Sequence, residues 1–547
     1  MTSQVELLRQ AFWHLRKGGP AQVRQWNIRR LATEQGGERR LPLPQAGLTR
    51  DYPRLNEAWK HFAEHSAVFP PASEARQYAN AFAQGWILTA ESSPHPDLVP
   101  RKWETHSIGS WIISHDPDLE FTQAKDQTGQ IEVLILGHTT DSERRLRTSA
   151  KVAPALLKSL EGSTDWAGLD RMVTWLGGRF IIVARRGVDL RVHVDAMATR
   201  SCYWSDQGGR LVLASHSALV AAACGTPSAK QAQWVLSHKN YVNPAGKCLP
   251  GMIAPHDGVK LVFANCFLEV KDGQATHRRF FDTPPEKLSI AEATERYLSE
   301  LRFQMDAALD RRPRSVLALT SGSDSRAILA GSLDLLQDAG AEAMTYHFFE
   351  RNADHSRKDL LGANRLAELA ELNHRVLNVP KHEAGSDPFW AMYRKTFPSW
   401  ARFPSLARMY YESFSAEESV IIGIGGEVGT AFYRDRDYPA ITPEVLASKF
   451  TQSEFQHDPR LIETMDEYMQ YTQLSEANSA GHDLLDLFYW EHRMSSWAAY
   501  GYSEADFGPD VVLPLNSRRL LHAMLSLPYK DRLKRSVYRQ LTSWSSI

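Results

Sequence analysis

The sequence is poor in cysteine, has no excess of charge of either sign and contains no long apolar run. Its four cysteines, Cys202, Cys224, Cys248 and Cys266, show none of the short paired spacings that bind zinc or form a redox pair. That pattern favours a reducing cytoplasm. Neither the N-terminal stretch MTSQVELLRQAFWHLRKGG nor any later segment has the uninterrupted apolar residues of a signal peptide or membrane span. We therefore expect a soluble, cytoplasmic protein with no membrane partner.

The charges nearly cancel, with 63 Lys and Arg against 64 Asp and Glu and a formal net charge of -1. A chain with this balance has no overall field that would attract phosphate backbones, so nucleic acid is not expected as a partner. At 547 residues the chain exceeds the size at which a single hydrophobic core stops growing. Two or three domains are expected.

The first two regions of the chain differ in their patterning. Residues 1–100 form an extension that mixes helical periodicity with polar, proline-containing interruptions, and this pattern assigns them no function. In residues 101–285, from about Trp103, short apolar runs bounded by turn signals predict a β-rich domain that ends near Pro284-Pro285. The expected strands are Gly109–Asp116, Ile131–Gly137, Gly178–Ala184, Leu190–Asp195, Tyr203-Trp204 and Arg210–Ser215, with a hairpin between Gly258 and Val270.

Residues 286–547 have the pattern of an α/β domain. Ser289 and Glu292 form a capping box at the start of a predicted helix. Four short apolar runs follow it, separated by segments long enough for crossover helices such as Lys358–Leu372. This alternation predicts a parallel, doubly wound sheet. The runs are Val316–Leu319, Met344–Phe349, Val376–Val379 and Val420–Ile422.

A loop of small residues follows the first of these predicted strands and reads LTSGSDSR from Leu319 to Arg326. Backbone N–H groups in such a loop, at the start of a helix, can approach a phosphate, and the hydroxyls donate further bonds. Asp324 would repel a bare anion, so its presence predicts Mg²⁺ together with pyrophosphate. No G-K-[ST] ending follows, which distinguishes the loop from a Walker A motif. An ordinary serine-rich turn is the alternative interpretation of this loop alone.

Other segments accompany the loop in a fixed order. They are Leu176–Phe180 (LGGRF), Asp195–Trp204 (DAMATRSCYW), Thr345 in the second predicted strand, Asp359–Ala363 (DLLGA), Gly423–Tyr433 (GIGGEVGTAFY), Trp490–Met494 (WEHRM) and Leu513–Asn516 (LPLN). Together with Thr320–Ser325, this order resembles the asparagine synthetase family, whose relatives include β-lactam synthetases and lasso-peptide cyclases. The resemblance covers roughly residues 103–545.

The resemblance implies an N-terminal hydrolase-like β-rich sandwich, a degenerate form of the glutamine amidotransferase domain, followed by a doubly wound parallel α/β ATP-pyrophosphatase domain. It also implies ATP and Mg²⁺ as cofactors, with Asp324 and Glu427 as the metal ligands. The residues expected to bind ATP and its pyrophosphate are Leu319, Thr320, Ser321, Gly322, Ser323, Asp324, Ser325, Thr345, Gly425 and Gly426.

The sequence departs from the family pattern at several positions. Thr2 stands where glutamine-hydrolysing relatives have a nucleophilic cysteine, and the segment after it has a helical pattern, so no glutaminase activity is expected. Ile424 replaces an acid near the reacting carboxylate, and a late lysine that stabilises the adenylating transition state has no direct counterpart before Ile547. The candidate catalytic residues are Glu427, Tyr433, Glu491 and Lys534, with Glu504 and Lys530 as further alternatives.

The expected function is an ATP-dependent ligase that adenylates a carboxylate and transfers the acyl group to an amine. Its expected partners are small-molecule or peptide substrates. Residues 1–100 are a candidate surface for a protein partner, and a homodimer is a candidate assembly. The alternatives are a catalytically degenerate scaffold or binding protein and a tRNA-modifying pyrophosphatase. We interpret His492 as a satisfied interface histidine, and Arg326 either as a phosphate contact or as cover for its helix.

Overall fold

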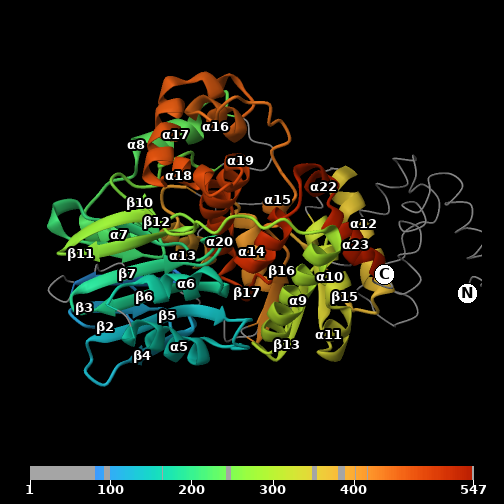
Figure 1. The fold of residues 1–547 in the computed structure, drawn as a ribbon, viewed down its shortest axis with the longest axis horizontal. Helices are drawn as coiled ribbons and strands as arrows, with labels where there is room; N and C mark the ends of the chain where they lie inside the picture. Colours follow the sequence, from blue (N-terminus) through green and yellow to red (C-terminus); the bar gives the residue numbers. More distant parts are fainter. Residues whose placement is uncertain are drawn as a thin grey trace, which may run out of the picture.

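The computed structural model describes residues 81–90, 99–162, 164–241, 248–347, 354–379, 388–400, 402–415 and 417–544. Two six-stranded antiparallel sheets form a sandwich on one side of the molecule, and a five-stranded parallel sheet lies on the other (Figure 1). The predicted combination of antiparallel and parallel sheets in a mixed α/β protein is therefore confirmed. Among the described helices, none is both long and apolar enough to span a membrane.

The sandwich sheets have the strand orders β10-β8-β9-β1-β3-β2 and β12-β11-β7-β6-β5-β4. The strands of the first are β1 (Trp86–Ala90), β2 (Glu104–Ile108), β3 (Trp111–His115), β8 (Tyr203–Ser205), β9 (Val212–Ala214) and β10 (Lys260–Leu261). Those of the second are β4 (Phe121–Lys125), β5 (Ile131–Thr140), β6 (Gly177–Arg186), β7 (Asp189–Val194), β11 (Cys266–Lys271) and β12 (Gln274–Arg279).

Alternation along β5 and β6 builds two cores, because successive side chains of a strand point to opposite faces. Leu134 and Ile181 are buried in the core shared with the first sheet. Val133 and Ile182 are instead buried under α5 (Ser149–Glu161) and α6 (Ala167–Thr174). A helical layer therefore covers the outer face of the second sheet. The helices α7 (Ser217–Cys224) and α8 (Lys230–Ser237) follow β9.

Two predictions for the sandwich are wrong. Strands begin before Trp103, because β1 lies earlier in the chain and pairs with β3 and β9 inside the first sheet. The hairpin does not lie between Gly258 and Val270: β10 pairs with β8, whereas β11 turns into β12 in the other sheet. The turn is Asp272-Gly273, and both residues have the positive φ, 51° and 75°, that a two-residue hairpin turn favours.

The parallel sheet has the order β15-β14-β13-β16-β17, and every neighbouring pair is parallel. Its strands are β13 (Arg314–Ala318), β14 (Glu342–His347), β15 (His374–Asn378), β16 (Glu418–Ile422) and β17 (Asp510–Val512). The first four confirm the predicted strands, and β17 was not predicted. The connecting helices are α10 (Ser323–Gly331), α11 (Leu333–Asp338), α12 (Asp354–Leu369), α13 (Pro388–Thr396) and α14 (Pro404–Ser413).

The helix before this sheet, α9 (Ile290–Leu309), begins as the sequence predicts. Ser289 Oγ accepts a hydrogen bond from Glu292 N at 3.2 Å, and Glu292 Oε2 accepts one from Ser289 N at 2.9 Å. These two bonds are the reciprocal contacts of a capping box, which satisfies N–H groups that a helix start otherwise leaves unpaired.

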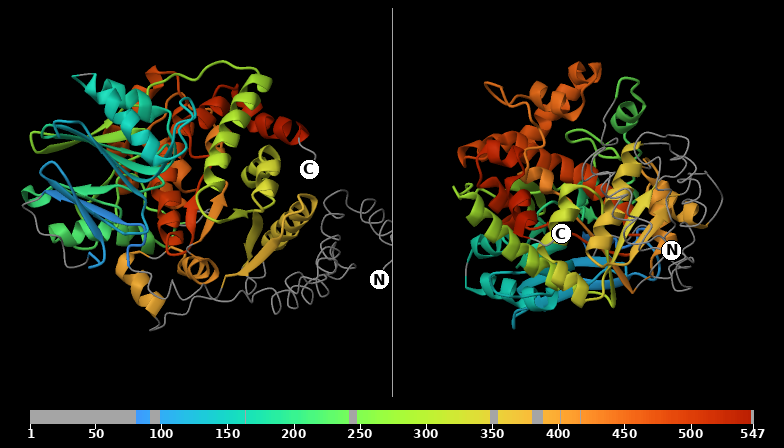
Figure 2. Two further views of the ribbon diagram at one scale, coloured as in Figure 1. Left: turned by 90° about the horizontal axis from the view of Figure 1, so that it is seen from below. Right: turned by 90° about the vertical axis from the view of Figure 1, so that its right-hand side faces the viewer.

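Of the C-terminal helices, those drawn in red near the centre of Figure 2 (left) lie between the sandwich and the parallel sheet, whereas α16 (Pro443–Phe450) and α17 (Pro459–Tyr471) lie at the top of Figure 1. The C-terminal set comprises α15 (Gly426–Gly429), α16, α17, α18 (Leu474–Ser479), α19 (Leu484–Leu487), a π-helix (Phe488–Ala498), α20 (Ala499–Ala505), α21 (Arg518–Leu525), α22 (Tyr529–Leu533) and α23 (Ser536–Trp544).

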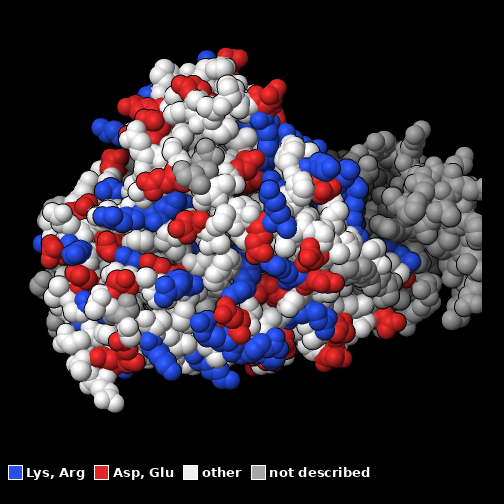
Figure 3. Space-filling model, in the orientation of Figure 1, with Lys and Arg blue, Asp and Glu red and all other residues white. Residues whose placement is uncertain are grey.

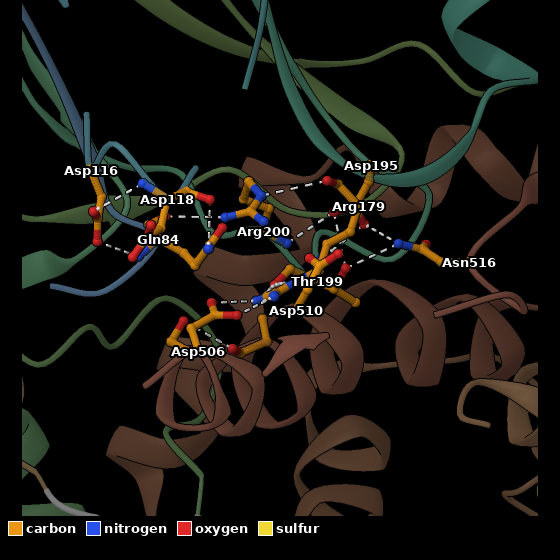
Figure 4. Close-up of polar contacts among 12 residues, drawn as sticks. Gln84, Asp116, Asp118, Arg179, Asp195, Thr199, Arg200, Asp506, Asp510 and Asn516 are labelled. Carbon is orange, nitrogen blue, oxygen red and sulfur yellow. Dashed lines mark hydrogen bonds and ion pairs between the residues drawn. The ribbon is translucent and has the colours of Figure 1, made fainter. Parts of the chain in front are cut away.

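A buried ion pair connects the sandwich to these helices (Figure 4). Arg179 of β6 donates from Nη1 and Nη2 to the two carboxylate oxygens of Asp506, at 2.5 and 2.8 Å. The two side chains are only 1% and 5% exposed. Arg179 also contacts Thr199 O. Because both charges are out of solvent, each depends on the other for its stabilisation.

Asn516 forms a second connection between the same two parts of the molecule. Its Nδ2 donates to Gly178 O at 2.7 Å and to Asp195 Oδ1 at 2.8 Å. Its Oδ1 accepts from Met197 N at 3.0 Å. The segment Leu513–Asn516 thus joins the end of β17 to the loop that follows β7, and Figure 4 shows this amide beside Asp195.

Candidate functional site

The loop after β13 lies at the carboxyl end of a central strand, where doubly wound sheets bind their ligands. Leu319 is buried at its base. Ser325 closes the loop, because its Oγ accepts from Thr320 N at 3.1 Å and lies 3.0 Å from Thr320 Oγ1. Ser321 and Gly322 are exposed at the tip. The fold therefore presents the small residues of the loop to solvent and anchors both of its ends.

Two carboxylates, those of Asp324 and Glu427, come together where this loop meets α15. Asp324 Oδ2 accepts from Gly426 N, and its Oδ1 accepts from Tyr538 OH, both at 3.0 Å. Glu427 Oε2 is buried and has no hydrogen-bond partner among the described residues. Burial, followed by the negative charge of Glu427, raises the pKa of Asp324 to about 7.

This pair of carboxylates fits a divalent cation. Mg²⁺ is usually held by one or two carboxylates together with phosphate oxygens. The orphaned oxygen of Glu427 and the repulsion that raises the pKa of Asp324 would both be relieved by a positive ion between the two groups. The residues present are thus suitable ligands for Mg²⁺.

Two glycines let the chain at the start of α15 approach the loop after β13. Gly425 has φ of 95°, in the left-handed region that glycine tolerates best. A Cβ on Gly426 would lie 2.0 Å from Tyr538 Oη and 2.2 Å from Asp324 Oδ1. No other residue would fit at Gly426 without displacing the groups that hold Asp324.

Gly426→Ala should therefore weaken Mg²⁺-dependent nucleotide binding by at least about tenfold and lower the free energy of unfolding by about 1–3 kcal/mol, the usual cost of overpacking. Equilibrium binding and chemical denaturation would measure the two effects. Gly162→Ala is the matched control, because a Cβ there meets nothing within 4 Å and its φ is -84°. Equal nucleotide affinity in both variants would contradict the role of the close approach.

A groove of about 650 Å³ opens beside the loop. Ser323 lies where the loop meets the groove, and Arg535 Nη1 donates a hydrogen bond to Ser323 Oγ. The described lining includes no carboxylate. Figure 3 shows basic side chains gathered over α22 and α23. A groove with this charge attracts polyanions such as a triphosphate. Its cationic residues are Arg326, Lys534, Arg535 and Arg539.

Arg535→Gln should lower the affinity for ATP by about tenfold, the effect expected from loss of one charge-assisted hydrogen bond. Added salt should weaken binding more in the wild type than in this variant, because salt screens the lost charge. Lys530→Gln is the matched control: Lys530, on α22, is an exposed cation like Arg535 but does not line the groove. Equal losses in the two variants would show only a general charge effect.

Several donors of the loop are engaged within the protein. Ser321 donates from its N–H and its Oγ to Asp359 Oδ1, at 2.7 and 2.5 Å. Gly322 N donates to Thr320 Oγ1 at 3.0 Å. A phosphate bound at the tip would have to compete with these contacts.

Glu491 and Glu504 have structural contacts. Both oxygens of the fully buried Glu491 accept from Arg279, each at 2.6 Å. Glu504 Oε1 accepts from Tyr393 OH at 2.5 Å and from Phe403 N at 2.9 Å. Because these carboxylates hold neighbouring elements together, the structure argues against the prediction that either is a general base.

Thr345 and Tyr433 are also turned away from an open site. Thr345 Oγ1 donates to Leu319 O at 2.6 Å and lies 2.9 Å from His374 Nε2, inside the sheet. Tyr433 is buried beside Phe488, and burial raises the pKa of its phenol. A phenol with a raised pKa is a poor general base near neutral pH.

Three further expectations can be compared with the structure. His492 Nε2 accepts from Gly251 N at 2.8 Å, which confirms that this histidine is satisfied within the protein. Arg326 lines the groove and donates from Nε to Gly322 O at 3.3 Å, so it contacts the backbone of the loop after β13. Lys534 lines the groove as well, whereas Thr2 lies outside the described residues.

The sequence analysis missed Arg535 and Tyr538, which reach the loop from the turn after α22 and from α23. Tyr538 and Arg539 lie on α23, Arg535 lies in the turn between α22 and α23 with a φ of 54°, and all three line the groove. The basic residues around Tyr538 were the available signal. Nothing in the local pattern indicates which distant loop this face contacts.

Comparisons with known proteins give only distant similarities. No family model and no curated protein matches the sequence. One similar solved structure is glutamine phosphoribosylpyrophosphate amidotransferase from B. subtilis complexed with ADP and GMP, at 10% identity and a TM-score of 0.23, covering 71% of this chain and 73% of that chain. Another, described as the allosteric regulatory enzyme of purine biosynthesis, has 10% identity, a TM-score of 0.24 and coverage of 65% and 72%. These similarities are too low to assign an activity.

Proposed function

We propose that this protein is an ATP-dependent, AMP-forming amide ligase. The observation that supports it most directly is the carboxylate pair of Asp324 and Glu427, set beside a hydroxyl-rich loop at the end of a parallel sheet. Two adjacent carboxylates are unfavourable unless a cation joins them, and the neighbouring groove carries four cationic side chains suited to a polyphosphate. ATP and Mg²⁺ are the proposed cofactors.

In this proposal the substrate carboxylate attacks the α-phosphorus of ATP, pyrophosphate leaves, and an amine then displaces AMP from the acyl-AMP. Ser321 and Ser323 donate hydrogen bonds to the departing pyrophosphate. Lys534 and Arg535 balance the negative charge that develops on it. Asp324 and Glu427 hold Mg²⁺, which supplies further charge neutralisation when bound. Exclusion of water from the site preserves the acyl-AMP until the amine arrives.

We further propose that the chain has no glutaminase activity, so that the amine is itself a substrate. Cys202, Cys248 and Cys266 are buried and Cys224 is half-buried. Burial raises the pKa of each of these thiols, which suppresses the reactive thiolate. The proposed setting is the cytoplasm, with a small-molecule or peptide carboxylate and an amine as substrates and with residues 1–100 as a surface for a partner protein.

ATP–pyrophosphate exchange tests this function, because reversible adenylation returns labelled pyrophosphate to ATP. The full chain is assayed with pooled carboxylates from a bacterial extract, with and without Mg²⁺. We expect exchange that requires both the pool and Mg²⁺. Fractionation of an active pool would then identify the acyl donor. Absence of exchange would contradict the ligase proposal if the chain also failed to bind ATP in the presence of Mg²⁺.

A second candidate, a non-catalytic scaffold or binding protein, is favoured by the internal contacts of the loop. Ser321 and Gly322 already donate to Asp359 and Thr320, and Thr345 is bonded within the sheet. A scaffold would either bind no ATP or bind it without regard to Mg²⁺. Calorimetric titration of ATP with and without Mg²⁺ therefore separates the two functions.

A further inference from the structure

Three potential metal ligands project from one face of the β2–β3 pair. Glu104 and His106 are two residues apart on β2, and Glu104 pairs directly with His115 across the ladder, so all three side chains lie on the same side. The ligand atoms that they offer all lie within 4.8 Å of one another. Glu104 Oε2 is 3.8 Å from His106 Nε2. In the described part of the chain, this is the sole cluster of three or more such residues.

Both histidines present an unsatisfied ring nitrogen. The Nε2 atoms of His106 and His115 are buried, and neither has a hydrogen-bond partner among the described residues. His115 is 1% exposed, and its Nδ1 lies 2.9 Å from Asp116 O. A carbonyl can only accept, so Nδ1 carries the proton and Nε2 has the free lone pair. A backbone carbonyl that accepts from one ring nitrogen orients the other nitrogen of a histidine toward a metal in this way.

An aromatic side chain from the other sheet holds the two imidazoles. Phe121 of β4 stacks on His106 and His115, with ring centroids 4.1 and 4.8 Å apart and interplanar angles of 15° and 7°. β2 and β4 are the edge strands of their sheets, and they lie on the side of the sandwich away from the parallel sheet (Figure 1). The side chains of Glu104 and His106 are 58% and 34% exposed, so an ion can enter from solvent.

We propose that Glu104, His106 and His115 form a binding site for a divalent transition-metal ion of the Zn²⁺ class, separate from the carboxylate pair at the phosphate loop. Two imidazole nitrogens and one carboxylate are ligands that zinc accepts, and a water completes four-coordination. A metal ion bound at this cluster would be a partner for two buried nitrogens that otherwise lose hydrogen bonds to water without compensation.

Binding requires only a small local adjustment. The ligand atoms lie within 4.8 Å of one another, and zinc–nitrogen distances are about 2.0–2.1 Å, so small side-chain shifts bring them to one ion. His115 is fixed in the core by its Nδ1 contact, whereas the partly exposed His106 can turn toward it. The bound ion would then clamp the edge strand β2 to β3 and limit fraying at a strand edge that has unpaired N–H and C=O groups.

Zn²⁺ and Co²⁺ titrations of the untagged full chain test the site, after removal of metal with a chelator. Asp324→Asn serves as the background, because it removes the other candidate cation site. We expect one tight equivalent of Zn²⁺ per chain by competition with a chromogenic chelator. Bound Co²⁺ should give the visible absorption of a four- or five-coordinate site with nitrogen ligands. Zn²⁺ should also raise the unfolding temperature.

His106→Gln should weaken Zn²⁺ binding by more than about 100-fold, beyond the ~10–100-fold that loss of an outer-shell partner costs. Glu104→Gln, at an exposed position, should weaken it by about tenfold or more without disturbing the core. Ser107→Ala, an exposed position on the opposite face of β2, is the matched control and should bind like its parent. The proposal is overturned if the parent binds no Zn²⁺, or if the His106 and Ser107 variants bind it equally.

Discussion

Asp506→Ala should lower the free energy of unfolding by about 3–5 kcal/mol, the cost of leaving one charge of a buried pair without its partner. The change leaves the guanidinium of Arg179, which is 1% exposed, with Thr199 O as its remaining hydrogen-bond acceptor among the described residues. Urea denaturation followed by circular dichroism and tryptophan fluorescence would measure the loss. The pair joins the sandwich to the C-terminal helices, so both signals should shift together.

Two controls test whether the loss of stability comes from burying an unpaired charge. Replacing both partners, as Arg179→Met with Asp506→Leu, should recover a large part of the loss, because no unpaired charge is then buried. Asp334→Ala removes a carboxylate from a bidentate pair of the same geometry, with bonds of 2.8 and 2.7 Å to Arg302, but at 39% and 61% exposure. That change should cost no more than about 1 kcal/mol. Equal costs for Asp334 and Asp506 would refute the importance of burial.

Asp324→Asn should reduce ATP–pyrophosphate exchange by about 10²–10³-fold or more, the range found when a preorganised electrostatic contact is removed. Asparagine has nearly the same shape and can still accept from Gly426 N, so the fold should persist. The lost charge is the one proposed to hold Mg²⁺ at the leaving pyrophosphate. Unchanged exchange with unchanged Mg²⁺ dependence would rule out Asp324 as a metal ligand.

The raised pKa of Asp324 adds a test in the pH dependence. Burial and Glu427 raise that pKa to about 7, so below this pH the carboxyl holds a proton that Mg²⁺ must displace. Mg²⁺-dependent ATP affinity should therefore fall by up to about tenfold per unit as the pH drops below about 7. Without metal, ionisation of this group lowers the free energy of unfolding as the pH rises from about 4 to 7. Asp324→Asn should remove both effects.

Local patterns predicted the fold where the controlling contacts are local. The start of α9 depends on Ser289 and Glu292, three residues apart, and was predicted correctly. The Asp272-Gly273 turn is also a local signal. The predicted hairpin nevertheless ended at Val270, before this turn. β17 has only three residues and is defined by its pairing with β16, far earlier in the chain. A short strand of that kind has no periodicity to detect.

In the candidate site, too, the features that depend on local contacts were predictable and those that depend on distant contacts were not. Thr320 and Ser325, five positions apart, close the loop after β13, so its shape was accessible from the sequence. The contacts that hold Asp324 come from Gly426 and Tyr538, which are 102 and 214 positions away. The family resemblance identified the segment that contains Gly426 but not the one that contains Tyr538. Glu491 is a case in which the local motif misleads. The motif predicted a catalytic residue, but Glu491 pairs with Arg279 of β12, 212 positions earlier in the chain.

The place of β17 in the parallel sheet also determines when the sheet can be finished during translation. β16 is made before β17, yet one of its edges pairs with β17, which emerges from the ribosome only after α16 to α20. Until then the nascent chain has an apolar strand with an open edge, a template for pairing with another chain. Chaperones that hold extended apolar segments therefore have a defined client here, and prematurely terminated chains carry the same exposed edge permanently.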